Sequence, residues 1–163
     1  MKNDVLVYYD LMTSLKTTRE VENFTSEIDN LKLTFFDCKG KSIKDGLCTI
    51  SSGYAEKIAQ IFKKNNLDIN DKDAFSSFLE TLKGLIKKFK VVKLVLAFDP
   101  AEKTITRIHN FVKEIIGIGY ILDIEVSRNV LGGAIVEFDG KYKDFSLRKK
   151  IEDTFKTKIN LGI

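Results

Sequence analysis

The sequence predicts an α+β protein in two parts, a small N-terminal helical bundle over residues 1–90 and a C-terminal βαββα unit over residues 91–163. Apolar residues recur at helical spacing throughout the first part. At Val91 the spacing changes to compact, β-branched runs, which are typical of buried strands. The chain has 10 glycines and 1 proline, which favours long helices over the many tight turns of a β-sandwich.

Four amphipathic helices account for most of the N-terminal part. Their apolar stripes consist of Val5, Tyr8, Tyr9, Met12 and Leu15; Val21, Phe24, Ile28, Leu31 and Phe35; Tyr54, Ile58, Ile61 and Phe62; and Phe75, Phe78, Leu79, Leu82, Ile86 and Phe89. Residues 37–50 contain glycines and no apolar period, so we expect a loop there. Four such helices with short connections are typical of a small bundle.

Capping residues indicate where several helices begin. Residues 17–20 (Thr-Thr-Arg-Glu) form a capping box before the second helix. We expect Asn70 to cap the fourth helix, with Asp73 near the positive end of its dipole. We expect Asp99 to cap the helix of the C-terminal part, with Pro100 in its first position.

The C-terminal part alternates between strands and helices. A strand over 91–98 is followed by a helix that ends at Gly117, and further strands are expected over 120–126 and 134–139. The strand–helix–strand order predicts a right-handed parallel crossover. After a glycine turn, Asp144 is expected to cap a last helix with the apolar residues Leu147, Ile151 and Phe155.

No catalytic, cofactor-binding or metal-binding motif is complete. Residues 40–42 (Gly-Lys-Ser) resemble the end of a phosphate-binding loop, but Phe35 occupies the position of its first glycine. His109 lacks a partner at catalytic spacing and is expected to be a partly exposed helix residue. Cys38 and Cys48 are expected to be reduced thiols. We therefore expect no enzymatic activity, no cofactor and no metal.

Charge and hydropathy limit the remaining classes of function. The net charge is +4, from 27 basic and 23 acidic residues spread evenly along the chain, so no basic tail indicates nucleic acid. No apolar run approaches the roughly 20 residues that span a bilayer, and the N-terminus lacks a signal-peptide core. The alternative function, a small nucleic-acid-binding α/β protein, would depend on Lys87, Lys88, Lys90, Lys93, Arg148, Lys149 and Lys150.

One motif near the C-terminus is more specific. The stretch from Leu131 to Ile151 reads LGGAIVEFDGKYKDFSLRKKI. It resembles the C-terminal signature of the delta subunit of F-type ATP synthases, the bacterial counterpart of the mitochondrial oligomycin-sensitivity-conferring protein. The residues that fit in register are Leu131, Gly132, Gly133, Gly140, Asp144, Ser146, Leu147, Lys150 and Ile151. The chain departs from the family pattern at Phe145, where a glycine is common.

The residues of this signature themselves predict a structural role. Gly132 and Gly133 allow positive φ angles and close packing between two strands. Gly140 follows an aspartate, which is a hairpin signal. Asp144 can accept a hydrogen bond from the amide of Ser146 as a helix cap.

The resemblance implies a non-catalytic stator subunit of the proton-translocating ATP synthase. It implies that the helical bundle binds N-terminal segments of the alpha subunits, and that the C-terminal domain joins the stalk of b-type subunits. The connection would keep the catalytic hexamer from turning with the rotor. Such a protein would lie at the cytoplasmic face of the bacterial membrane, in contact with the membrane only through the complex, and would not bind nucleic acid.

Apolar residues in excess of one buried stripe suggest where the alpha-subunit segment binds. Leu11 lies off the main stripe of the first helix, and the stripe of the fourth helix is unusually wide. We expect Tyr9, Leu11, Phe78 and Leu82 to contribute to an exposed groove on the bundle.

Overall fold

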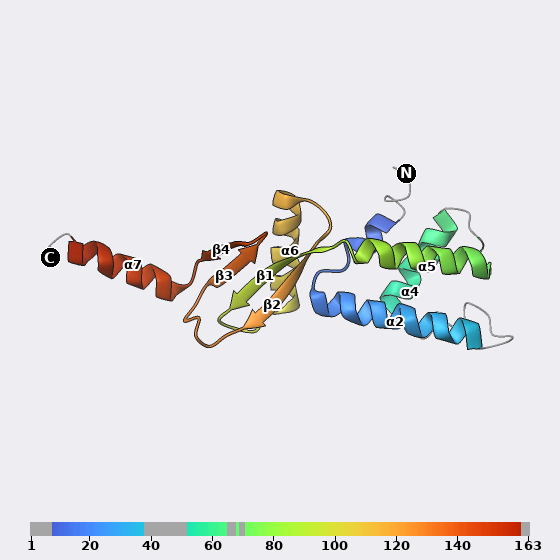
Figure 1. The fold of residues 1–163 in the computed structure, drawn as a ribbon, viewed down its shortest axis with the longest axis horizontal. Helices are drawn as coiled ribbons and strands as arrows, with labels where there is room; N and C mark the ends of the chain where they lie inside the picture. Colours follow the sequence, from blue (N-terminus) through green and yellow to red (C-terminus); the bar gives the residue numbers. More distant parts are fainter. Residues whose placement is uncertain (1–7, 38–51, 65–67, 69–70, 161–163) are drawn as a thin grey trace. The chain divides into compact units, whose positions relative to one another are not determined.

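The chain divides into two compact units (Figure 1). The computed structural model describes residues 8–37, 52–64, 68 and 71–160. The helical unit comprises Met1–Leu15 and Arg19–Phe89, and the α/β unit comprises Lys16–Thr18 and Lys90–Ile163. Most of the loop expected over 37–50, including both cysteines, lies outside the described residues.

The described part of the helical unit contains three long helices. They are α2 (Thr18–Asp37), α4 (Ser52–Lys64) and α5 (Lys72–Ile86), and residues 8–12 add a short helical segment. Val5, at the start of the first expected helix, lies outside the described residues. The start of α2 at Thr18 agrees with the capping box expected over 17–20.

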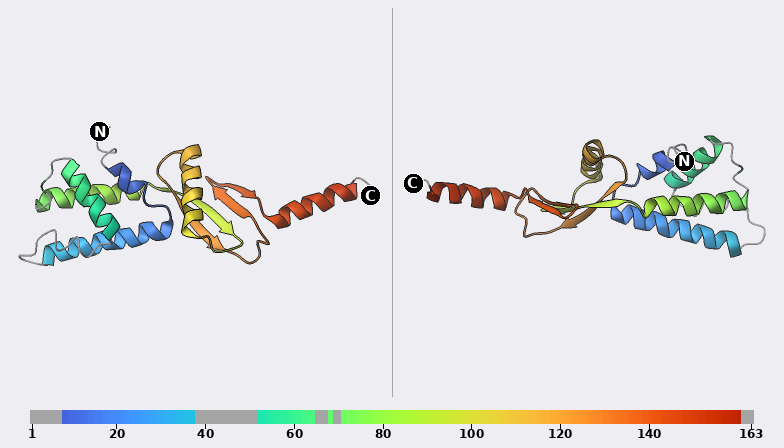
Figure 2. Two further views of the ribbon diagram at one scale, coloured as in Figure 1. Left: turned by 180° about the vertical axis from the view of Figure 1, so that it is seen from behind. Right: turned by 45° about the horizontal axis from the view of Figure 1, so that its top comes forward.

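Two ion pairs join α2 and α5, which lie side by side (Figure 2). Lys32 Nζ is 3.4 Å from Glu80 Oε1, and the Lys83 ammonium contacts the Asp29 carboxylate. The later residue of the two on α2 pairs with the earlier residue of the two on α5, so the helices run antiparallel. These pairs are partly exposed, and each contributes at most about 1 kcal/mol. The buried core therefore supplies most of the stability.

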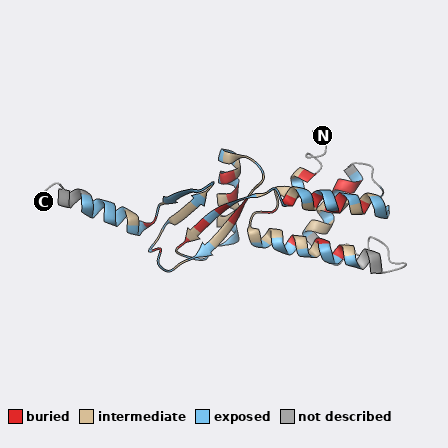
Figure 3. Ribbon diagram, in the orientation of Figure 1, coloured by how far each residue is buried: buried red, intermediate tan, exposed pale blue. Residues whose placement is uncertain are grey.

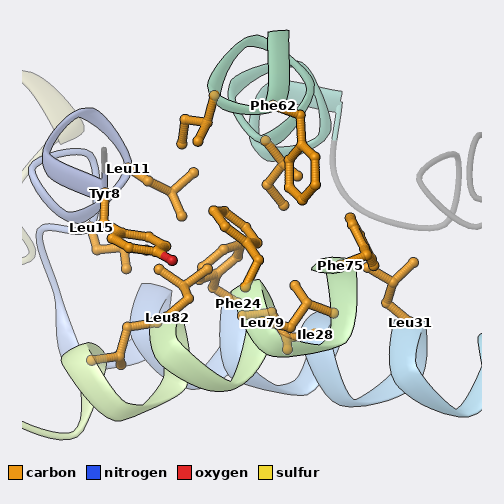
Figure 4. Packing of buried hydrophobic residues seen from close by; sticks show 14 residues of the cluster. Tyr8, Leu11, Leu15, Phe24, Ile28, Leu31, Phe62, Phe75, Leu79 and Leu82 are labelled. Carbon is orange, nitrogen blue, oxygen red and sulfur yellow. The ribbon is translucent and has the colours of Figure 1, made fainter. Parts of the chain in front are cut away.

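That core is rich in aromatic side chains (Figure 4). The ring centroid of Phe62 lies 5.4 Å from that of Phe75 and 4.9 Å from that of Phe78. Tyr8 stacks on Phe78 at 5.0 Å. The buried members are Tyr8, Leu11, Leu15, Phe24, Ile28, Leu31, Ile58, Ile61, Phe62, Phe75, Phe78, Leu79, Leu82 and Ile86. Apolar residues from every described helix of the unit thus share one core.

The cap of α5 differs from the expected one. Asp71, and not Asn70, is the N-cap residue, and its carboxylate accepts hydrogen bonds from the amides of Asp73 and Ala74. Asp71 is extended (φ −74°, ψ 105°), as a cap residue must be. Asparagine and aspartate are both good N-cap residues, so the sequence alone does not determine which of these two neighbours caps the helix. Asp73 lies in the first turn as predicted.

The α/β unit contains one mixed sheet of four strands. Its elements are β1 (Lys90–Leu96), α6 (Glu102–Ile116), β2 (Tyr120–Val126), β3 (Ala134–Phe138), β4 (Lys141–Asp144) and α7 (Leu147–Asn160). The strand order is β2-β1-β3-β4. β1 and β2 are parallel, joined through α6, whereas β3 is antiparallel to both β1 and β4. Helices together with this sheet confirm the α+β class.

The strand β4 was not predicted. The segment after Gly140 was expected to lead directly to the last helix, so the βαββα prediction omitted one strand. Lys141–Asp144 instead pairs with β3 through a hairpin whose two turn residues, Asp139 (φ 51°) and Gly140 (φ 70°), both have positive φ. This is the conformation that an Asp-Gly pair favours in a tight hairpin.

The start of α6 also differs from the expected one. The N-cap is Ala101 and not Asp99, and its side chain makes no capping hydrogen bond. Ala101 is extended (φ −61°, ψ 153°), so the helix begins at Glu102 and Asp99 precedes the cap by two residues. The end at Gly117, which has a φ of 104°, agrees with the prediction.

One face of the sheet packs against α6. Buried Val92, Leu94 and Leu122 form its core with Val112 of the helix. His109 is also buried on this helix, with Nε2 3.2 Å from the carbonyl oxygen of Tyr120. The expectation that His109 is partly exposed is therefore wrong, because its side of α6 faces the sheet and the backbone satisfies its ring nitrogen.

The helix α7 leaves much of its apolar surface uncovered. Its described side chains are almost all exposed (Figure 3), including Leu147, Ile151 and Phe155.

None of the described helices combines the length and the apolar character needed to cross a membrane.

Candidate partner-binding site

The C-terminal signature forms a clamp between the segment before β3 and the segment after β4. The Phe145 amide donates to the Ala134 carbonyl at 2.9 Å, and the Leu147 amide donates to the Gly132 carbonyl at 2.8 Å. These bonds extend the β3–β4 ladder past Asp144, which pairs with Ile135. The first residue of α7 is thereby bound to the sheet by backbone hydrogen bonds.

Gly133 makes this clamp possible. Its φ is 81°, a conformation that favours glycine. A Cβ placed on Gly133 would lie 2.4 Å from the carbonyl oxygen of Phe145 and 3.2 Å from Cα of Ser146. The expected close approach is thus confirmed at Gly133, although it is made to the segment that leads into α7.

The other two glycines of the signature have different roles. Gly132 has no positive φ, and a Cβ on it would meet Cβ of Leu147 at 3.6 Å, an ordinary contact. Of the two glycines expected to allow a positive φ, Gly133 therefore adopts one and Gly132 does not. Gly140 is needed for its φ of 70° in the hairpin, since nothing lies within 4 Å of its Cβ position.

Asp144 and Ser146 together form the start of α7. The Asp144 carboxylate accepts a hydrogen bond from the Ser146 amide at 2.8 Å, as predicted. The Ser146 hydroxyl accepts one from the Lys149 amide at 3.2 Å, which is the bond of an N-cap residue. The cap is therefore Ser146, with Asp144 forming a turn before it. Hydrogen bonding by the Ser146 side chain, and then by its amide, lowers the pKa of Asp144.

Next to the clamp, an apolar groove of about 340 Å³ opens between α6 and the sheet. It lies on the face of the sheet that α6 covers. Its lining consists of Val92, Phe111, Val112, Ile115, Ile116, Val136, Phe138, Lys141, Lys143 and Phe145. The groove thus extends from one side of α6 to β3 and the edge strand β4.

The groove leaves large apolar side chains in contact with solvent. Phe111 is 62% exposed, Ile115 66% and Phe145 53%. Lys141 and Lys143 are the charged residues among the described lining, which contains no acidic side chain. An apolar surface of this kind with a basic rim is suited to a protein partner.

The sequence patterns did not predict this groove. The helical spacing of Ile105, Ile108, Val112 and Ile115 predicts one apolar stripe on this helix, whereas the structure exposes Ile115. Phe111 is an apolar residue outside that stripe, and this was the sequence signal that could have indicated a second contact surface. Phe145 is also part of the lining, at the position where the family pattern commonly has glycine.

The residues predicted to form an exposed groove on the helical unit lie mainly in its core. Leu11 and Leu82 have no exposed surface, and Phe78 is 5% exposed. Tyr9 is half-buried. The expected exposed surface is wrong for the first three residues because they are buried in the core that the helices of this unit share. A role for any of the four in binding a partner stays a prediction.

Two of the basic residues on which the nucleic-acid alternative depends form ion pairs with carboxylates of the same helix. On α7, Arg148 pairs with Glu152 at 3.0 Å and Lys149 with Asp153 at 3.1 Å. Hydrogen bonding to Asp153 raises the pKa of Lys149. Two cations of the cluster are thus neutralised within the helix.

Among the described residues, no group of three or more potential metal ligands comes together.

The fold and the clamp define a class of two-part protein, in which a helical unit is joined to an α/β unit. The α/β unit ends in a helix that is clamped to its sheet, and it carries an apolar groove. A family model described as the ATP synthase delta (OSCP) subunit matches residues 72–157. The chain belongs to this family.

No curated protein matches the sequence. A chain from the cryo-EM structure of the Polytomella F-ATP synthase (primary rotary state 3) is similar at 21% identity and a TM-score of 0.39. The similarity covers 47% of this chain and all of that one.

The two glycines of the pair give a matched test of the clamp. Gly133→Ala is expected to destabilise the protein by roughly 1–3 kcal/mol, because it combines an unfavourable φ with a backbone clash. Gly132→Ala is expected to change stability by about 0.5 kcal/mol or less. Urea unfolding followed by circular dichroism measures both. Equal effects of the two substitutions would contradict the assignment of the clamp to Gly133.

The turn before α7 predicts a pH dependence. The lowered pKa of Asp144 means that its carboxylate stabilises the fold above the ordinary value of 3.8. This contribution is lost as the pH falls through the lowered value in the folded state. Ser146→Ala should raise the pKa of Asp144 in an NMR titration of the full chain. Ser127→Ala, which removes a turn elsewhere in the unit, should leave it unchanged. A Ser146→Ala protein with the original pKa would show that another group causes the shift.

Proposed function

We propose that this chain, a peripheral-stalk subunit of an F-type ATP synthase, links the catalytic alpha/beta hexamer to the b-subunit stalk and resists the torque of the rotor. Membership of the delta (OSCP) family supports this function. The role is mechanical and non-catalytic, and it needs binding surfaces in place of a reactive group. We also propose that the complex is bacterial and that the chain lies at the cytoplasmic face of the membrane, with no membrane contact of its own.

The observation that carries the proposal is the groove between α6 and the β3–β4 edge. An amphipathic helix binds such a groove through apolar residues at helical spacing. Lys141 and Lys143 favour a helix with carboxylates beside its apolar stripe, because the described lining offers no competing acid. We assign this groove to a helix of the b-type stalk subunit.

The helical unit is proposed to bind the N-terminal segments of the alpha subunits. Of the four residues predicted for this contact, Tyr9 retains accessible surface in the isolated chain. It neighbours Tyr8, which is buried against Phe78 in the core. Tyr9 is therefore the residue among the four that a partner can reach without opening the unit.

Substitutions in the groove should weaken binding of the stalk. Phe111→Ala and Ile115→Ala are each expected to reduce affinity for the soluble part of the cognate b subunit by about tenfold or more, since each removes a large apolar contact. Isothermal titration calorimetry with the full chain measures the effect. Lys143→Glu should also weaken binding, and should do so most strongly at low salt.

The control for these variants is Leu33→Ala, which removes an equally exposed apolar side chain from α2. It should leave the affinity for the b subunit unchanged. Circular dichroism establishes that each variant is folded. Wild-type affinity in the folded Phe111→Ala and Ile115→Ala proteins would exclude the groove as the stalk site, and the b subunit would then bind elsewhere on the chain.

A second pair of variants separates contact with the alpha subunit from core packing. Tyr9→Ala should leave the helical unit folded but weaken binding of an alpha N-terminal peptide by roughly 1–3 kcal/mol. Phe78→Ala should destabilise the unit by about 3–5 kcal/mol, because its ring packs against Tyr8 and Phe62. Peptide titration with parallel unfolding measurements checks both. Unchanged affinity in folded Tyr9→Ala would place the alpha site away from this residue.

A further inference from the structure

The strand β2 lies at one edge of the sheet, next to β1 only among the named strands. An edge strand presents unpaired backbone groups that can pair with another chain. β2 carries apolar residues over most of its length, including the buried Ile121 and Leu122. An uncovered edge of this kind would be a hazard for a protein that must remain a separate subunit.

Residues 16–18 lie along this edge. Thr17 forms an isolated parallel β-bridge with Leu122, and the Leu122 amide donates to the Lys16 carbonyl at 2.8 Å. These three residues belong to the α/β unit, although the residues on both sides of them belong to the helical unit. The chain therefore enters the α/β unit twice, first at Lys16 and again at Lys90.

Side chains fix this short segment to both layers of the unit. The Lys16 ammonium donates to the Thr106 hydroxyl at 2.9 Å and lies 3.5 Å from the Glu102 carboxylate, and both partners are on α6. The Thr18 hydroxyl lies 3.4 Å from the Asp123 carboxylate on β2. The segment thus has a backbone bond to the strand and polar contacts to the helix that packs on the sheet.

We propose that Lys16–Thr18 is a strap that completes the edge of the α/β unit and gives it a second connection to the helical unit, held to β2 and α6 by hydrogen bonds and not by the covalent chain. The first connection is the direct passage from Phe89 to Lys90. The strap does not depend on the identity of any partner, so its test is independent of the proposed function.

Backbone geometry provides an internal control for this test. The Lys90 amide donates to the Gly119 carbonyl, and the Ser127 amide donates to the Leu96 carbonyl, so odd-numbered groups along β2 face β1. Even-numbered groups face the edge, because alternate backbone groups of a strand point to opposite sides. The Leu122 amide is bound by the strap, whereas the Ile124 amide faces the same edge beyond it.

Amide hydrogen exchange of the full chain, measured residue by residue by NMR, tests the strap. After correction for intrinsic rates, the Leu122 amide should exchange about tenfold or more slowly than the Ile124 amide. Equally fast exchange at the two positions would overturn the proposal, since an open edge protects neither amide.

A double variant tests what fixes the strap. Lys16→Ala with Thr18→Ala removes the contacts to α6 and to Asp123, and should speed exchange of Leu122 severalfold while Ile121, which faces β1, keeps its rate. Lys63→Ala with Thr81→Ala, at exposed positions of the helical unit, should change neither amide. An unchanged Leu122 rate in the first double variant would overturn the role of these side chains. Acceleration of Leu122 and Ile121 together would indicate general loosening of the unit and would also overturn it.

Discussion

A four-stranded sheet is wider than one helix can cover, and the surfaces of the α/β unit follow from this constraint. Strands about 4.8 Å apart place the outer strands of this sheet roughly 14 Å from each other, whereas a helix with its side chains is about 10–12 Å across. α6 follows β1 and precedes β2, so it packs over that side of the sheet and buries Val92, Leu94 and Leu122. The β3–β4 side keeps apolar side chains without a second helix, and the groove forms at the boundary of the cover.

The clamp fixes the start of the last helix, α7, relative to the sheet. The bonds from Phe145 to Ala134 and from Leu147 to Gly132 continue the strand geometry up to the first residue of α7, and Ser146 then caps the helix. Gly133 allows the two backbones to approach closely enough for these bonds. The signature residues therefore contribute no chemistry. They determine where α7 begins, and its apolar residues remain uncovered in the isolated chain.

Local sequence patterns predicted the helices and strands whose bounds depend on neighbouring residues in the chain. They did not predict the features that depend on contacts with residues far away in the sequence. The bounds of β2 and the end of α6 at Gly117 were predictable from apolar runs and glycines. β4 was not, because Lys-Tyr-Lys-Asp has no apolar alternation and is a strand only through its bonds to β3. Likewise a helical stripe does not reveal how many neighbours it faces, so Leu11 and Leu82 were expected in a groove although they fill a core. The groove beside α6 needs residues from separate elements, which no spacing rule connects.

The magnitudes indicate that the contact proposed for the groove would not hold a stalk by itself. Burying the exposed parts of Phe111, Ile115 and Phe145 contributes roughly 3–5 kcal/mol at the usual value for large apolar side chains. Association costs on the order of 4–15 kcal/mol in lost freedom of motion. The groove therefore barely offsets that cost, whereas a stator must remain bound under load. Further apolar surface of the unit includes the stripe of Leu147, Ile151 and Phe155 on α7, which is exposed and clamped to the same sheet. The proposed connection to the stalk would be firm if one partner covered both surfaces, and the clamp would then fix the geometry in which that partner meets them together.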